Sequence, residues 1–252
     1  MKLAVIIPSI KPYDISCRLA VDSIIKSIQR SNIDCDYTIY VHSPNNPNDE
    51  RIVFVKEEKQ GGENIAINNI ITKISDKYDY YFLTADDFVL TDDSNLLDAI
   101  NFINSEAYAS RKMKICTLAT TQDSPCYSIA QLPFPEGSPY GRTYQGDGFL
   151  IPNFIICRFP VFDKKTLNVY LNNHIFPPNV YSGYGDSCLS YYLTLNDEPC
   201  LEVSSVKLHF LEHIHDIDRI SRRSSEWIRL RSESCIKAYE YIKNYIKGNK
   251  YV

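Results

Sequence analysis

The stretch DYYFLTADD, from Asp79 to Asp87, is an apolar run that ends abruptly in two adjacent carboxylates. Aromatic side chains suit a strand that is covered on both faces, and such a strand belongs to an α/β sheet. Because α/β sheets bind their ligands outside the carboxyl ends of the strands, Asp86 and Asp87 lie where a ligand is expected. Carboxylate oxygens favour Mg²⁺ or Mn²⁺, ions that also bind diphosphates. The alternative is that two solvated aspartates simply begin a turn.

The segments that precede this stretch alternate between strand and helix patterns. Short apolar runs at 2–7, 37–41 and 52–55 predict three strands. Apolar residues at helical spacing predict one helix that begins near Asp14 and a second that opens at Gly61-Gly62. Alternation at this spacing implies right-handed crossovers and a largely parallel sheet, which is the α/β class.

The pattern is less regular after Asp87. We predict a helix over 96–103, a strand over 114–119, another over 149–159, a helix through Leu189 and Leu193, and a final strand over 201–210. Between these, residues 120–148 hold Pro125, Pro133, Pro135, Pro139 and four Gly, which is loop composition. A loop of this length is usually functional, so it is a candidate lid or acceptor-binding loop.

Length and composition indicate one large globular domain. The chain has 252 residues, of which 44% are hydrophobic and 23% charged. No window approaches the roughly 18 apolar residues of a membrane span, and the start, Met1 to Pro8, is too short for a signal peptide. We therefore expect a cytoplasmic protein. The eight Cys include no C-x-x-C pair, so neither a zinc site nor a disulfide framework is indicated.

The charge is unevenly distributed along the chain. Residues 219–252 carry nine Lys/Arg against three Glu, a balance of +6, while the whole chain has a net charge of −4. We expect one domain over 1–218 and a basic helical extension over 219–252 packed on it. Such an extension suits contact with DNA or with an anionic membrane surface. A solvated helix face with mixed charges is the alternative.

Four short motifs, taken in order, resemble the inverting, family-two-like glycosyltransferases of GT-A fold, which have a Rossmann-like sheet. They are Ile7-Pro8-Ser9 after the first strand, Gly62-x-x-x-Ala66-x-Asn68 at a helix start, Leu83-x-x-Asp86-Asp87, and Gly185-Asp186-x-x-Leu189. The resemblance covers residues 1–95 and, more loosely, 146–215.

This resemblance implies a nucleotide-sugar donor bound across the strand ends, with Mn²⁺ or Mg²⁺ bridging its phosphates. It implies that Asp86 is a metal ligand and that Asp186 is the general base. His213 and His215 would supply a late metal or phosphate contact. The donor-binding residues that it implies are Pro8, Ser9, Gly62, Asn68, Asp86 and Asp87. For several of them a plainer role stays open: Asp186 as a helix N-cap, the histidines as solvated side chains, and the glycines as a turn.

Two positions depart from the family pattern. The second strand ends in Tyr40-Val41-His42-Ser43, where the family usually places an acidic residue near the nucleobase. Thr84 stands where the first aspartate of the D-x-D metal motif is expected, which leaves the metal site with fewer charges. The donor nucleobase therefore cannot be read from the sequence, and weak metal binding or inactivity stays open.

Three functions remain in competition. The first is transfer of a sugar to a glycan, a lipid-linked glycan or a hydroxylated DNA base of the kind that some phage sugar transferases modify. The second is a nucleotidyltransferase, although the loop Ser9–Tyr13 lacks the glycines expected after the first strand of such an enzyme. The third is a non-catalytic module that binds nucleic acid through its basic extension. The oligomeric state cannot be inferred from the sequence.

Overall fold

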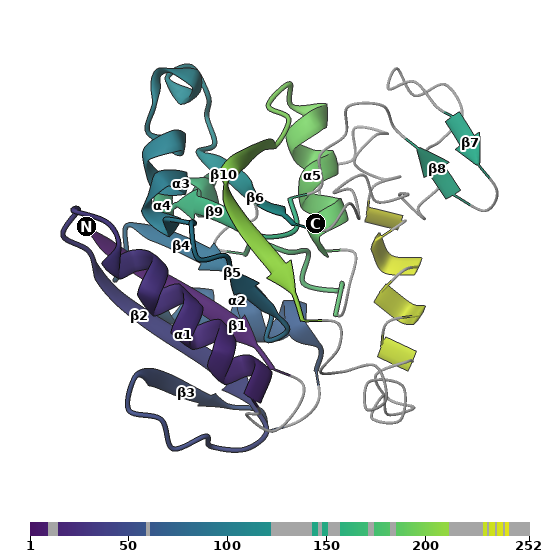
Figure 1. Cartoon of the computed structure of the whole chain (residues 1–252). Helices are drawn as coiled ribbons and strands as arrows, with labels where there is room; N and C mark the ends of the chain where they lie inside the picture. The colour runs from purple at the N-terminus through teal and green to yellow at the C-terminus, as the bar shows by residue number, and fades with distance from the viewer. Residues whose placement is uncertain are drawn as a thin grey trace.

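Eight of the described strands form one mixed sheet with helices on both faces (Figure 1). The structure is a computed structural model, and it describes residues 1–9, 15–58, 61–121, 143–145, 148–150, 157–170, 174–181 and 185–211, with short helical pieces at 229–230, 232–234, 236–238 and 240–241. The strand order in the sheet is β3-β2-β1-β4-β9-β6-β10-β5. This arrangement confirms the predicted α/β class.

The described elements have the following bounds. The strands of the large sheet are β1 (Lys2–Pro8), β2 (Asp36–Ser43), β3 (Ile52–Lys56), β4 (Tyr80–Leu83), β5 (Phe88–Leu90), β6 (Ile115–Thr120), β9 (Pro160–Asp163) and β10 (Leu201–Phe210). The helices are α1 (Ile15–Gln29), α2 (Glu63–Ile74), α3 (Leu96–Ile103), α4 (Lys164–Tyr170) and α5 (Gly185–Leu195), with the 3₁₀ turn η1 (Glu106–Tyr108). A separate two-stranded sheet holds β7 (Thr143–Gln145) and β8 (Gly148–Leu150).

The strand directions bring six carboxyl ends to one edge of the described sheet. β1, β2, β3 and β4 run parallel to one another, and β6 runs parallel to β10. β9 lies antiparallel to both β4 and β6, so the two parallel groups share one direction. β5 is antiparallel to β10. Six of the eight strands thus share one direction, which confirms the predicted largely parallel sheet, and β5 and β9 run antiparallel to them.

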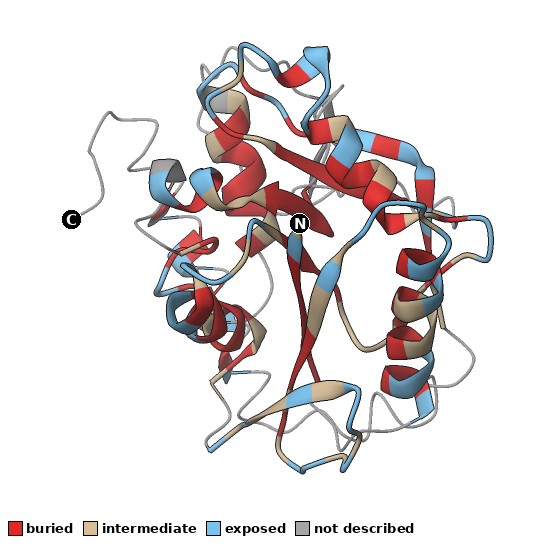
Figure 2. Cartoon of the chain, turned by 90° about the vertical axis from the view of Figure 1, so that its left-hand side faces the viewer, coloured by how far each residue is buried: buried red, intermediate tan, exposed pale blue. Residues whose placement is uncertain are grey.

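The hydrophobic core lies in two layers, one on each face of the sheet. Alternate residues of β1 divide between them, because successive side chains of a strand point to opposite faces. Leu3 and Val5 join the layer under α1 and α3, while Ala4 and Ile6 join the layer under α2 and α5. In α1 the buried residues lie on the side that faces the sheet and the exposed ones on the other (Figure 2), whereas α5 is buried on nearly every side. Helices with one apolar face and strands buried on both faces explain this arrangement.

One predicted strand is wrong at its end, and its middle, residues 151–156, lies outside the described residues. The sequence predicted a strand over 149–159, but β8 ends at Leu150 and residues 157–159 lie outside any strand. β9 begins only at Pro160, which tolerates the first position of a strand because it has no N–H to donate. The final predicted strand, 201–210, is confirmed as β10.

Several predictions fall outside the described residues. The loop over 120–148 does so except at its ends and in β7, and His213 and His215 do so entirely. In the C-terminal segment the structure describes helical residues between 229 and 241, among which Leu230, Ala238 and Tyr241 are buried. The proposed division near residue 218 thus stays a prediction. None of the described helices combines the length and the apolar character that a membrane crossing requires.

Candidate functional site

The site begins where the carboxyl ends of β1 and β4 meet. The backbone N–H of Thr84 donates to the carbonyl of Ile6 at 3.2 Å, which extends the pairing of the two strands by one residue beyond β4. The hydroxyl of Ser9 donates to Oδ2 of Asp86 at 2.8 Å. The structure thus brings together Ser9 and Asp86, two of the predicted site residues, and Pro8 precedes them as the last residue of β1.

Asp87 lies against the end of β10. Its backbone carbonyl accepts a hydrogen bond from the N–H of Leu211 at 2.9 Å. Asp86 and Asp87 are both half-buried, so their carboxylates lie at the surface of this edge. Leu211 is the last described residue before the segment that contains His213 and His215.

The start of α2 lies beside this edge and depends on a glycine. Gly62 has φ 88° and ψ 155°, a conformation that side chains with a Cβ adopt poorly, and its carbonyl accepts the N–H of Ala66 at 3.2 Å. The turn that opens α2 therefore needs glycine at this position for its conformation alone.

Asn68, in the middle of α2, is almost fully buried. Its Nδ2 donates to the carbonyl of Phe176 at 2.8 Å, and its Oδ1 accepts the N–H groups of Ile175 at 3.1 Å and Phe176 at 3.2 Å. The amide of Asn68 thus holds the 175–176 backbone. In the described structure, Asn68 therefore supports the backbone behind the site.

The start of α5 packs closely on the start of α2. A Cβ on Gly185 would come within 2.8 Å of the side chains of both Asn64 and Phe176. The next residue, Asp186, is half-buried in the first turn of α5, and its Oδ1 accepts the N–H of Ser187 at 2.7 Å. The N-terminal end of a helix stabilises a negative charge, so the carboxylate of Asp186 suits this place.

The oxygen groups at the edge suit a hard divalent ion. They include the carboxylates of Asp86 and Asp87 and the hydroxyl of Ser9. Thr84 is buried, and its Oγ1 has no hydrogen-bond partner among the described residues. Mg²⁺ and Mn²⁺ are commonly held by one or two carboxylates, with substrate phosphates and water completing the shell. Among the described residues, no group of three or more His, Cys, Asp or Glu side chains is arranged so that it could hold a metal ion, so a bound ion would need ligands from a substrate or from beyond them.

Two titratable residues at the neighbouring strand ends, His42 and Glu57, were not assigned to the site by the sequence reasoning. The carbonyl of His42 accepts the N–H of Ser9 at 2.7 Å, and the N–H of Glu57 donates to the carbonyl of Ser43 at 2.9 Å. Burial lowers the pKa of His42, and the charge of Lys73 lowers it further. Burial raises the pKa of Glu57, which a hydrogen bond from the N–H of Gly61 partly opposes. An acidic residue therefore follows β3, one strand away from the position where the family pattern places one.

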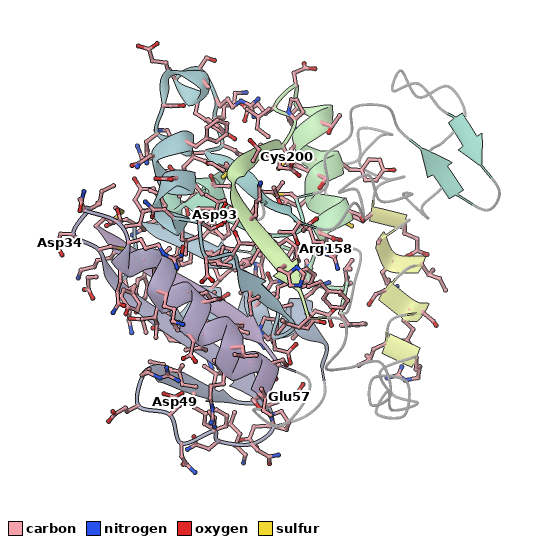
Figure 3. All side chains as sticks on the ribbon, in the orientation of Figure 1. Asp34, Asp49, Glu57, Asp93, Arg158 and Cys200 are labelled. Atoms are coloured by element: carbon pink, nitrogen blue, oxygen red, sulfur yellow. The ribbon has the colours of Figure 1, made fainter. Side chains whose placement is uncertain are left out.

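Arg158 was also missed. Its guanidinium lies over the ring of Phe88, 5.0 Å from the centroid, and over the ring of Phe159 at 5.3 Å. Arg158 is labelled in Figure 3. Phe88 directly follows Asp87. No sequence signal marks Arg158, because the fold alone brings it to Phe88.

Comparison of the sequence with protein-family models and with curated proteins finds no match. Solved structures do match. The mannosyltransferase PcManGT from Pyrobaculum calidifontis, in complex with GDP-Man and Mn²⁺, is 13% identical, with a TM-score of 0.53 over 98% of this chain and 74% of that one. Residues 1–349 of TarS from S. aureus are 11% identical, with a TM-score of 0.51 over 100% and 93%. The same part of TarS in complex with UDP-GlcNAc has a TM-score of 0.50. Against a longer TarS chain, the match covers only 36% of that chain. At these identities the likeness shows a shared fold.

Proposed function

We propose that this chain, which has the GT-A fold of glycosyltransferases, moves a sugar from a nucleotide-sugar donor to a hydroxyl group of an acceptor, with inversion. The observation that carries the proposal is the hydrogen bond between Ser9 and Asp86. It joins the ends of β1 and β4 at the edge where α/β folds bind their ligands. Asp87 lies at the same edge, where its carbonyl accepts a hydrogen bond from the residue that follows β10.

The donor would lie across the strand ends. Asp86 would hold Mn²⁺ or Mg²⁺, with His213 or His215 as a further ligand. A divalent ion bound there would stabilise the negative charge that grows on the leaving diphosphate. Pro8, Ser9 and Gly62 would line the diphosphate, and Asp87 would bind a hydroxyl of the ribose.

Asp186 would act as the general base. As the acceptor oxygen attacks the anomeric carbon, its proton passes to the carboxylate of Asp186. The new carbon–oxygen bond forms on one face of the sugar while the bond to the diphosphate oxygen breaks on the other. The bonding electrons leave with the diphosphate, and this geometry inverts the configuration at carbon. The acceptor would be a glycan, a lipid-linked glycan or a hydroxylated DNA base.

The direct test is thermal unfolding of the chain with a panel of nucleoside diphosphates and nucleotide sugars, in Mn²⁺ and in EDTA. A ligand that binds only the native state raises the melting temperature, by an amount that grows with concentration over Kd. The proposal expects a shift with one nucleotide class that EDTA abolishes. GDP-mannose and UDP-GlcNAc belong in the panel because the structures with the same fold bind them. No shift with any nucleotide would favour the nucleic-acid-binding module instead.

Two substitutions separate the proposed roles. Asp86→Asn is expected to reduce the Mn²⁺-dependent shift, because it removes a charged ligand. Asp186→Asn is expected to keep that shift and to abolish sugar transfer to the acceptor. Asp98→Asn, in the first turn of α3 at the opposite edge of the sheet, is the matched control and should change neither property. Equal loss of both properties in both variants, with lowered melting temperatures, would contradict the role assignments.

A further inference from the structure

Among the described residues, the guanidinium of Arg158 is held by two aromatic rings. Arg158 is exposed, and its two contacts are with the faces of Phe88 and Phe159. Within the described residues it makes no hydrogen bond and no ion pair. Ring contacts of this kind orient a guanidinium while leaving its five N–H donors available, because the attraction acts through the ring face.

The ring contacts place Arg158 near the turn that carries Asp86 and Asp87, the candidate metal ligands. Phe88, under the guanidinium, directly follows Asp87 in the chain. The ring of Phe88 also packs on Phe159 at 4.5 Å and on Phe210 at 5.0 Å, and Leu211 then bonds to the carbonyl of Asp87. Arg158 therefore lies at the point where the Asp86-Asp87 turn meets the end of β10.

A backbone hydrogen bond of the preceding residue connects Arg158 to α5. The residue before it, Cys157, donates its N–H to Oγ of Ser190 at 2.7 Å, and Ser190 Oγ donates to the carbonyl of Asp186 at 2.6 Å. The backbone that carries Arg158 is thus fastened to the first turn of α5. Arg158 is therefore linked on one side, through Phe88, to the turn of the candidate metal ligands and on the other, through Cys157 and Ser190, to the helix of the candidate base.

We propose that Arg158 binds the β-phosphate of the nucleoside diphosphate, the group that leaves in the proposed transfer. This inference rests on the proposed function. The surrounding side chains Asp86, Asp87 and Asp186 are acidic, so a diphosphate there needs positive charge beyond that of a divalent ion. A planar guanidinium matches two phosphate oxygens with two parallel N–H bonds, which the compact ammonium of lysine cannot do.

Arg111 provides a matched control within the same chain. Its guanidinium also lies over an aromatic ring, that of Tyr108, at 4.8 Å. It differs in donating to the carbonyl of Pro199 at 2.7 Å, and it precedes β6 at the opposite edge of the sheet. Arg111→Ala therefore removes the same side chain and a similar ring contact far from the proposed site.

The test compares a nucleoside diphosphate with the monophosphate of the same base by calorimetric titration in Mn²⁺. If Arg158 binds the β-phosphate, Arg158→Ala weakens diphosphate binding by about tenfold or more, the size expected for a charge-assisted hydrogen bond. Monophosphate binding should stay within about twofold, and Arg111→Ala should change neither. Arg158→Lys should restore only part of the diphosphate affinity.

Each other outcome has a distinct meaning. Equal weakening of diphosphate and monophosphate binding by Arg158→Ala, or no weakening of either, would overturn the assignment of Arg158. If Arg158→Ala also lowers the melting temperature, the test still holds. The ratio of diphosphate affinity to monophosphate affinity, and the affinities of Arg158→Lys, still report on binding of the β-phosphate. Failure of the unsubstituted protein to bind either nucleotide would instead overturn the proposed function, and the inference with it.

Discussion

At the scale of single residues, Thr84 is a buried side chain whose hydroxyl has no hydrogen-bond partner among the described residues. A buried polar group without a partner costs free energy, so Thr84→Val should raise the free energy of unfolding by about 1 kcal/mol without ligand. Thr117→Val is the control, because the hydroxyl of Thr117 accepts the N–H of Phe159 at 3.1 Å. That variant should lose about 1–3 kcal/mol. Urea unfolding measures both, and a loss of stability in Thr84→Val would show that its hydroxyl is satisfied.

Glu57 makes a prediction about pH. Because burial raises its pKa in the folded protein above the ordinary 4.5, the folded state favours the protonated carboxyl. The resulting stability is present below the unfolded pKa and is lost as the pH rises through the folded pKa. Glu57→Gln keeps an acceptor for the N–H of Gly61 and removes the charge. The free energy of unfolding of the variant should therefore rise relative to that of the unsubstituted protein as the pH increases from about 4 to about 7. Urea unfolding at both pH values checks this, and a constant difference would contradict burial as the cause.

At the scale of elements, the site depends on how closely α5 approaches α2. Gly185→Ala would place a methyl group 2.8 Å from the side chains of Asn64 and Phe176, so these side chains or α5 itself must shift, and a shift of α5 carries Asp186 with it. We expect a loss of about 1–3 kcal/mol of stability and a fall in transfer, with Mn²⁺-dependent nucleotide binding retained. The double variant Asn64→Ala/Gly185→Ala should recover part of the stability in urea unfolding. Full activity of Gly185→Ala would show that the position of α5 is not critical.

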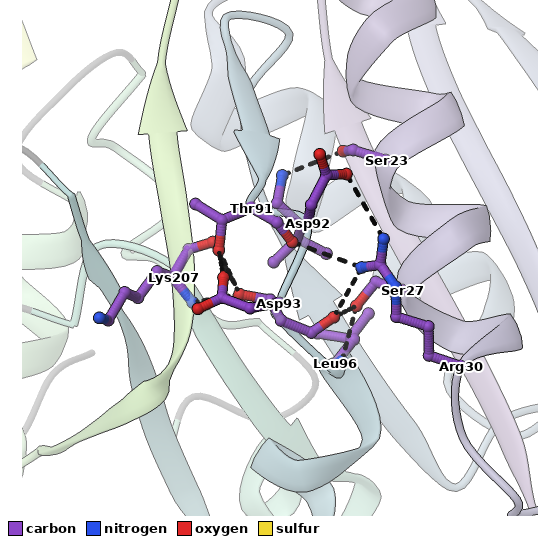
Figure 4. A network of polar contacts seen from close by, with 10 residues as sticks. Ser23, Ser27, Arg30, Thr91, Asp92, Asp93, Leu96 and Lys207 are labelled. Atoms are coloured by element: carbon purple, nitrogen blue, oxygen red, sulfur yellow. Dashed lines mark hydrogen bonds and ion pairs between the residues drawn. The ribbon is translucent and has the colours of Figure 1, made fainter.

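The elements on the other face are joined by a polar network (Figure 4). Ser27 of α1 donates to the carbonyl of Ser94 at 2.9 Å and accepts the N–H of Leu96 at 2.8 Å. Ser94 Oγ in turn accepts the N–H of Lys207 of β10 at 2.8 Å. Ser27→Ala would leave the buried N–H of Leu96 unpaired, and should cost about 1–3 kcal/mol in urea unfolding. Nucleotide binding should not change, because β5 leads the chain away from the site and the network begins only after β5. A loss of nucleotide binding in Ser27→Ala would instead show that the network and the site are coupled.

At the scale of the whole molecule, local periodicity was sufficient for the first half of the chain. The strands and helices predicted up to Asp87 are all present in the described residues, because each carries its own apolar pattern. β5 and β9 were missed, since three or four residues hold no period and their antiparallel direction depends on distant strands. Motifs at the strand ends marked Ser9 and Asp86 as donor-binding residues, but the hydrogen bond between them was not predicted. Arg158 could not be found in this way, because rings from other strands position it.

The two core layers predict how stability is shared across the sheet. Ile24 of α1 and Ile71 of α2 are fully buried in different layers, one on each face. Each Ile→Val change should cost about 0.5–1.5 kcal/mol. With the sheet between them the two sites share no direct contact, so the double variant should lose the sum within about 0.5 kcal/mol. Because strands such as β1 contribute side chains to both layers, the loss should appear in one cooperative urea transition. Two separate transitions in either single variant would show that the layers unfold independently, and that the edge holding Asp86 and Asp186 is not one rigid unit.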